Sequence, residues 1–250
     1  MIAFFHATLY QPLYNALIYL IDVLPGADVG LAVLILTVFV KLVLLPLSEK
    51  ATATQLAVKM YEKDLEEVKR KYKDDKDGQA KAILKFYKDH DINPFSGFLV
   101  LFIQLPIVIS LYYVFYKGGL PVINKDLLYS FVKAPEVVDM HFLGVLDVAA
   151  KSVLLAFLVG ITQFYQMKLS FPPLPKRDSN QKEISMKEEL SRSMNLQMRF
   201  VMPVVTALIA YGISGAVALY WTTSNIFAIA QELYLRRKFK HLRVEVTDKK

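Results

Sequence analysis

The chain has 250 residues, of which 54% are hydrophobic, a net charge of +7 and a mean hydropathy of +0.34. These values, with the charged residues gathered into separate segments, exclude an ordinary soluble domain and favour an all-α polytopic membrane protein. Cysteine is absent and the four histidines are scattered, so we expect no disulfide, no metal site and no cofactor. The distribution of positive charge fits membrane topology better than a DNA-binding surface.

Residues 1–28 contain no Lys or Arg, so they lack the basic region of a signal peptide and we expect them in the mature protein. Pro12 interrupts this apolar segment, and Tyr10, Tyr14 and Tyr19 suit a helix at the level of the lipid headgroups. We predict an amphipathic interfacial helix on the outer face of the membrane. A sixth span is the alternative.

Five segments have the length and hydrophobicity of transmembrane helices. The last two meet at a tight turn that contains Gly212 and Gly215. The five predicted spans are residues 29–47, 95–116, 145–167, 200–213 and 216–235.

Lys and Arg are distributed unequally between the connections. There are none in residues 1–28 and three in 117–144, against eleven in 48–94, seven in 168–199 and seven in 236–250. By the positive-inside rule, the N-terminus faces outside, and the two basic connections and the C-terminal tail face the cytoplasm.

The first cytoplasmic connection, residues 48–94, carries eleven basic and ten acidic side chains. Two apolar stripes at helical spacing, separated by a turn at 74–78, predict a helical hairpin. It is either a solvated spacer or a docking surface for a partner or an arriving substrate. In the second connection, 185–198 predicts a short amphipathic helix. The basic tail, 236–250, is predicted to meet anionic lipids, and a ribosomal RNA contact is the alternative.

Lys41 lies inside the first span, where a charge is expensive. The stretches 95–116, 152–167 and 200–231 contain no Asp or Glu to neutralise it. One interpretation is snorkelling, because its Cα lies roughly 9 Å from the cytoplasmic end of the helix. The other is a functional cation in a hydrated site.

The spans contain no catalytic constellation: we find no phosphate-binding Gly loop, no Ser–His–acid set and no pair of carboxylates for proton relay. We therefore expect that the protein is not an enzyme. Their polar residues either form interhelical hydrogen bonds or together line a wet cavity. They are Thr37, Gln104, Ser110, Thr162, Gln163, Gln166, Thr222, Thr223, Ser224 and Asn225, with Trp221 beside the last group. Pro106 is predicted to kink the second span.

In order and spacing, the segment from about Gly30 to Phe239 resembles the YidC membrane-protein insertases and their mitochondrial and thylakoid relatives. The matching features are a basic residue in the first span followed by Pro46-Leu47, Gln55, Lys59-Met60, Asn93-Pro94, Gly97, Ile103-Gln104-Leu105-Pro106-Ile107, Leu111-Tyr112, Gly215, Leu219-Tyr220-Trp221 and Ser224-Asn225. Together with five spans and a charged hairpin, this set is specific.

The resemblance implies a five-helix core around a hydrophilic groove that is open to the cytoplasm and to lipid and closed on the outer side. It places Lys41, Thr37 and Trp221 in that groove, with Gln163, or else Gln166, from the third span. Lys41 replaces the usual Arg, so a fixed planar fork becomes a point charge. We expect neither the large outer domain nor the lipoprotein cysteine of other members in this protein.

The function implied is that of a bacterial inner-membrane insertase and chaperone, in which Lys41 attracts acidic segments of client membrane proteins. Candidate partners beside the clients are a Sec translocon, the ribosome and anionic lipids. A small-solute channel or transporter with Lys41 as its anion site is the alternative, although the five spans show no inverted repeat. An assembly factor that inserts nothing is a third interpretation.

Overall fold

The computed structural model of the chain describes residues 6–90, 92–93, 106–115, 120–170 and 193–239. The described part is predominantly helical and contains one two-stranded sheet. The chain divides into two compact units. One consists of residues 1–41 and 106–232, and the other of residues 42–105 and 233–250.

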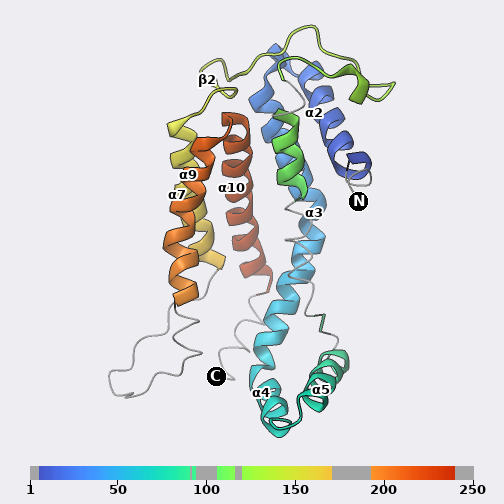
Figure 1. Ribbon diagram of the computed structural model, residues 1–250, viewed down its shortest axis with the longest axis vertical. Coiled ribbons are helices and arrows are strands. Elements are labelled where there is room, and N and C mark those ends of the chain that lie inside the picture. The colour runs from blue at the N-terminus through green and yellow to red at the C-terminus, as the bar shows by residue number, and fades with distance from the viewer. Residues whose placement is uncertain (1–5, 91, 94–105, 116–119, 171–192, 240–250) are drawn as a thin grey trace. The chain divides into compact units, whose positions relative to one another are not determined.

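The first unit begins with η1 (His6–Tyr10), α2 (Gln11–Val23) and η2 (Pro25–Ala27), and then enters the long helix α3 (Val29–Met60) (Figure 1). Pro12 stands in the first turn of α2, where its missing N–H has no helical acceptor to lose. The later elements are the helix Pro106–Phe115, η3 (Lys125–Leu127), β1 (His141–Phe142), β2 (Leu146–Asp147), α7 (Val153–Ser170), η4 (Gln197–Val201), α9 (Met202–Gly212) and α10 (Gly215–Lys238).

Three of the described helices are long and apolar enough to cross a membrane: Val29–Val58, Val153–Ser170 and Ser193–Gly212. Helix α10 has 24 residues, but Thr222–Asn225 in its middle lower its hydropathy. The second predicted span is described only as Pro106–Phe115, because residues 95–105 and 116 lie outside the described part. The number of five spans therefore stays a prediction.

Helix α2 is attached to the connection that follows Pro106–Phe115. The buried Asn15 amide donates to the carbonyl of Leu127 (2.8 Å) and accepts from the N–H of Tyr129 (2.7 Å). The hydroxyl of Tyr14 accepts from the N–H of Asn124 at 2.8 Å. Tyr14 and Tyr10 are thus buried against protein, while Tyr19 is exposed. These contacts join the N-terminal segment to a part of the chain more than a hundred residues later.

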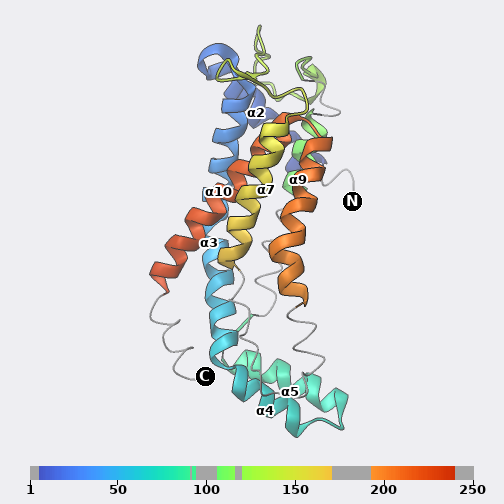
Figure 2. The same cartoon turned by 90° about the vertical axis from the view of Figure 1, so that its left-hand side faces the viewer.

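Helices α7 and α9 lie side by side (Figures 1 and 2). Their close approach depends on Gly160, because a Cβ at this position would lie 3.1 Å from the Cβ of Ala207. Helix α7 begins at Val153 rather than at the predicted Val145, since Leu146–Asp147 forms a strand with His141–Phe142. Helix α9 ends at Gly212 and α10 begins at Gly215.

The second unit contains the end of α3, then α4 (Glu62–Lys71) and α5 (Lys76–Asp89), which contact each other. Asp75 caps α5 by accepting from the N–H of Gly78 at 2.9 Å, and the side chain of Gln79 donates to the carbonyl of Lys69 at 2.7 Å. Residues 185–192 and 240–250, where a short helix and the basic tail were predicted, lie outside the described part. The cytoplasmic location of α4 and α5 stays a prediction.

The last turn of α10 is joined to α3 within this second unit. The Lys238 ammonium lies 2.6 Å from the Glu49 carboxylate, whose hydrogen bond raises the pKa of Lys238. Both side chains are partly exposed, so this ion pair contributes little to stability.

Gly30, in the first turn of α3, provides a test of the packing at this end of the first unit. A Cβ at Gly30 would lie 2.5 Å from the Cβ of Phe142 in β1, whereas a Cβ at Gly212 would have no atom within 4 Å. We expect Gly30→Ala to destabilise the protein by about 1–3 kcal/mol through overpacking. Gly212→Ala should be neutral. Thermal unfolding in detergent measures both, and equal melting temperatures for the two variants would contradict the contact.

Candidate functional site

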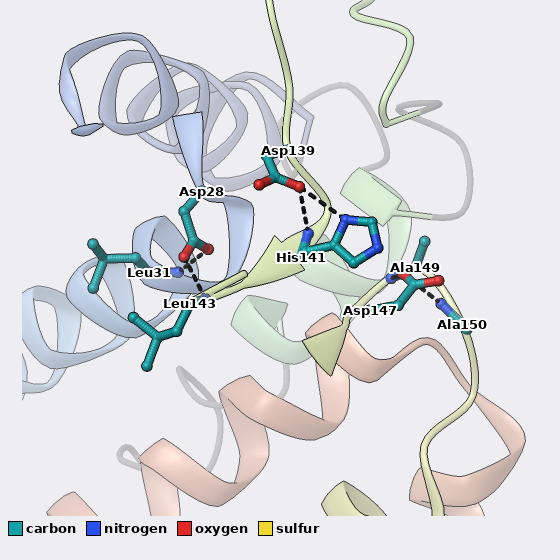
Figure 3. A network of polar contacts seen from close by, with 8 residues as sticks. All are labelled: Asp28, Leu31, Asp139, His141, Leu143, Asp147, Ala149 and Ala150. Carbon is teal, nitrogen blue, oxygen red and sulfur yellow. Dashed lines mark hydrogen bonds and ion pairs between the residues drawn. The ribbon is translucent and has the colours of Figure 1, made fainter. Parts of the chain in front are cut away.

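A buried carboxylate organises the end of the bundle at which α3 begins (Figure 3). Asp28 is 7% exposed and precedes the first residue of α3. One of its oxygens accepts from the N–H of Leu31 at 2.9 Å, and the other accepts from the N–H of Leu143 at 2.7 Å. Asp28 is therefore the N-cap of the first apolar helix and also a link to the β1–β2 hairpin.

Backbone hydrogen bonds extend this link to two helices. The N–H of Val29 donates to the carbonyl of Asp139 (2.9 Å), and the N–H of Asp139 donates to the carbonyl of Ala27 (3.0 Å). At the start of α10, the N–H groups of Gly215 and Ala216 donate to the carbonyls of Ala150 (2.9 Å) and Val148 (2.8 Å). The first N–H groups of both helices, which have no partner inside a helix, are thereby satisfied.

We call this arrangement, formed by residues 27–31, 139–150 and 215–216, the outer cap, because the charge distribution predicts that this end faces outside. Gly215 belongs to it for a steric reason, because a Cβ there would lie 3.1 Å from the carbonyl oxygen of Ala150. Asp139 accepts from the backbone N–H and the ring of His141, and these bonds hold the pKa of its carboxyl below the usual range. The outer cap closes one end of the first unit with backbone bonds.

Thr37 and Lys41 occupy one face of α3, as the sequence predicted from their spacing. Thr37 is buried, and its hydroxyl donates to the carbonyl of Val33 at 2.6 Å. Lys41 is half-buried. Phe39 and Val43 are 61% and 60% exposed, and residues two positions from Lys41 lie on the opposite side of a helix. Lys41 therefore does not share the most exposed face of α3.

Polar side chains on α7 and α10 contact one another. The amide of Asn225 donates to the hydroxyl of Thr162 at 3.1 Å, which joins the two helices directly. Along α7, the amide of Gln163 lies 3.5 Å from that of Gln166, which donates to the hydroxyl of Ser170 at 3.2 Å. The structure thus brings together Thr162 and Asn225 from different helices, and Gln163 and Gln166 along one helix.

Among the buried polar atoms of the described part that lack a hydrogen-bond partner are three in the middle of apolar helices. They are Ser110 Oγ, Gln163 Oε1 and Thr222 Oγ1, from the Pro106–Phe115 helix, α7 and α10. Each unsatisfied atom of this kind costs about 1–3 kcal/mol unless water or a ligand supplies the bond. Water or a bound polar group would supply such a bond.

The other predicted site residues are placed as follows. Ser224 is buried beside Asn225, and Trp221 is half-buried one turn before Asn225 on α10. Pro106 is the first described residue of its helix, so its predicted kink concerns a junction outside the described part, as does Gln104. Asp28 was missed. Its position directly before the apolar run at Val29 is a helix-start signal from which it was recognisable.

The class of protein is a helical integral membrane protein. It has long apolar helices with buried polar atoms inside them, and backbone hydrogen bonds satisfy the N–H groups at the helix ends. A family model described as 60Kd inner membrane protein matches residues 20–242. The chain belongs to this family, that of the YidC proteins, which confirms the resemblance found in the sequence.

Two relatives show how much of the family the chain represents. A protein from Clostridium tetani named membrane protein insertase YidC is 29% identical over 213 residues, 85% of this chain and 84% of that protein. One from Francisella tularensis subsp. novicida, with the same name, is 28% identical over 211 residues, 84% of this chain. The chain spans 33% of the length of this second relative.

The bond between Asn225 and Thr162 can be tested against a matched site. Asn225→Leu and Thr162→Val should each lower the free energy of unfolding by about 0.6 kcal/mol, the mean for interhelical bonds in membranes, and a double-mutant cycle should show coupling. Thr223→Val is the control, because the Thr223 hydroxyl donates only to the carbonyl of Leu219 in its own helix. Additive effects of Asn225→Leu and Thr162→Val would exclude the bond.

Proposed function

We propose that the protein is a membrane protein insertase and chaperone. The observation that carries this proposal is the family match over residues 20–242. It is joined by two relatives named as insertases, one matched over 84% of its length and one over 33%. In this proposal, clients enter a hydrophilic groove that is open to the cytoplasm and to lipid. The groove is lined by Lys41, Thr37, Gln104, Gln163, Gln166, Trp221, Ser224 and Asn225.

The groove hypothesis is supported by the three unsatisfied buried atoms. Ser110 Oγ, Gln163 Oε1 and Thr222 Oγ1 each need a partner that the described protein does not provide. Water in a groove supplies these bonds at rest, and the polar backbone of an entering client replaces that water. The exchange lowers the cost of moving a client's polar segment out of bulk water.

Lys41 supplies the electrostatic part of the mechanism. It lies away from the exposed face formed by Phe39 and Val43, one turn after the buried Thr37. A partly desolvated ammonium attracts an acidic side chain more strongly than one in water does. Acidic residues in a client's polar tail are thus drawn into the groove, after which the client's apolar helix leaves sideways into lipid because its own surface is hydrophobic.

The outer cap gives the groove its direction. Backbone bonds between 139–150 and the first turns of α3 and α10 close that end, so a client segment retained there is not released freely. With the N-terminus outside, as the charge distribution predicts, the open end faces the cytoplasm. There α4, α5 and the basic tail would receive clients from the ribosome or a Sec translocon and contact anionic lipids.

Replacing Lys41 tests the electrostatic mechanism. With single-span clients that have acidic N-terminal tails, Lys41→Ala should slow insertion into liposomes roughly tenfold, the loss of about 1.4 kcal/mol. Lys41→Arg should restore it, and clients with neutral tails should insert equally well in all forms. Lys168→Ala is the control, since it removes the same charge from the exposed end of α7.

If all Lys41 variants insert clients with acidic tails equally well, Lys41 does not act by attracting acidic residues. A solute flux through the purified protein that Lys41→Ala abolishes would instead favour a channel or transporter. An assembly factor would bind the client without moving its tail across the membrane, and protease protection of the tail distinguishes this outcome.

Removing an unsatisfied hydroxyl tests the wet groove separately. Thr222→Val and Ser110→Ala delete atoms that have no partner, so each should leave the melting temperature unchanged or raise it. If these hydroxyls hold groove water, the same variants should insert clients more slowly. Unchanged insertion together with unchanged stability would show that neither hydroxyl contributes to the groove.

A further inference from the structure

The tip of the β1–β2 hairpin exposes two large apolar side chains. Leu143 is 67% exposed and Val145 is 86% exposed, on either side of Gly144. Single exposed apolar residues are common on protein surfaces. Here two lie together at one tip in a defined backbone conformation.

Leu143 adopts a backbone conformation that its side chain disfavours. Its φ is 52°, and that of Gly144 is 71°. A left-handed conformation costs a leucine roughly 1–2 kcal/mol, whereas glycine or asparagine adopts it readily. A turn in water would favour a small polar residue at this position, so the apolar side chain at 143 is not explained by the turn.

All three backbone N–H groups of the tip are hydrogen-bonded within the protein. That of Leu143 donates to the Asp28 carboxylate (2.7 Å), that of Gly144 to the carbonyl of His141 (3.1 Å), and that of Val145 to the carbonyl of Phe142 (3.1 Å). An exposed turn in water can leave such donors to solvent. In a lipid environment they must be satisfied internally.

The hairpin is fixed at the level where the first apolar helix begins. Leu31, in the first turn of α3, and Leu143 donate to the same Asp28 carboxylate, and Figure 3 shows their side chains extending to the same side of it. Phe142 packs directly over Gly30. A membrane span that begins at Val29 would put the tip at the boundary between headgroups and acyl chains.

We propose that Leu143 and Val145 insert into the lipid leaflet that surrounds the N-terminal end of α3, and that the hairpin tip anchors the outer cap in the membrane. The contact continues the lipid-facing surface of the apolar helices. This inference is independent of the proposed insertase function, because it concerns only how the cap meets the bilayer.

The chemistry of the contact is apolar rather than ionic. The carboxylates next to the tip, those of Asp139 and Asp147, are partly or fully exposed and oppose an anionic headgroup. The occupant we infer is therefore the upper acyl-chain region of the lipid, and zwitterionic phosphatidylcholine alone should suffice. Anionic lipid should add nothing to the contact.

The absence of cysteine makes the test direct, because any single introduced cysteine can be labelled. The full chain with Val145→Cys is labelled with an environment-sensitive fluorophore and placed in phosphatidylcholine nanodiscs. We expect a blue-shifted emission that lipids brominated on upper acyl carbons quench and that aqueous iodide does not. Leu154→Cys, on the exposed face of α7, is the lipid-facing reference, and the exposed Lys133→Cys is the aqueous one.

Iodide quenching of the Val145→Cys label equal to that of Lys133→Cys would overturn the proposal. Protection from both iodide and brominated lipid would also overturn it, because a second copy of the chain would then cover the tip. A label-free experiment checks that the fluorophore does not create the contact. A diazirine on the lipid acyl chain should modify the peptide that contains residues 143–145, and Leu143→Asn with Val145→Asn should lose this labelling.

Discussion

The structure depends on satisfying backbone polar groups at helix ends that face an apolar solvent. A helix leaves its first N–H groups without partners, and the bilayer offers none. At the start of α3 the Asp28 carboxylate accepts from Leu31 and the carbonyl of Asp139 accepts from Val29, and at the start of α10 the carbonyls of Val148 and Ala150 are the acceptors. Because the same segment serves both helices, the ends of two predicted spans are positioned by one set of bonds.

The same constraint explains why α10 is less apolar than the other long helices. Its polar residues would be costly against lipid, but Asn225 bonds to Thr162 and Ser224 is buried. Thr222 is also buried without gaining a bond. Thr222 and Asn225 are three residues apart and share a face of α10, so the proposed wet groove on that face would supply the bond that Thr222 lacks.

Local features of the fold were predictable from the sequence, and long-range ones were not. Hydrophobic runs and turn residues predicted the apolar helices, the break near Gly212 and the shared face of Thr37 and Lys41. The contacts of Asp28 with Leu143 and of Gly30 with Phe142 join residues more than a hundred positions apart. No periodicity records such pairs. Helix α7 was expected to begin at Val145 because the pattern cannot distinguish a short apolar strand from a helix.

The polar residues of the site differ in whether their hydrogen bonds within the protein account for them. Thr37 donates to Val33 in its own helix, and Thr162 and Asn225 satisfy each other, so all three are explained by structure alone. Ser110, Gln163 and Thr222 are not, because each retains an atom whose burial is costly without an external partner. Their presence on three separate helices is therefore the feature of the described part that the proposed wet groove explains and that packing alone does not.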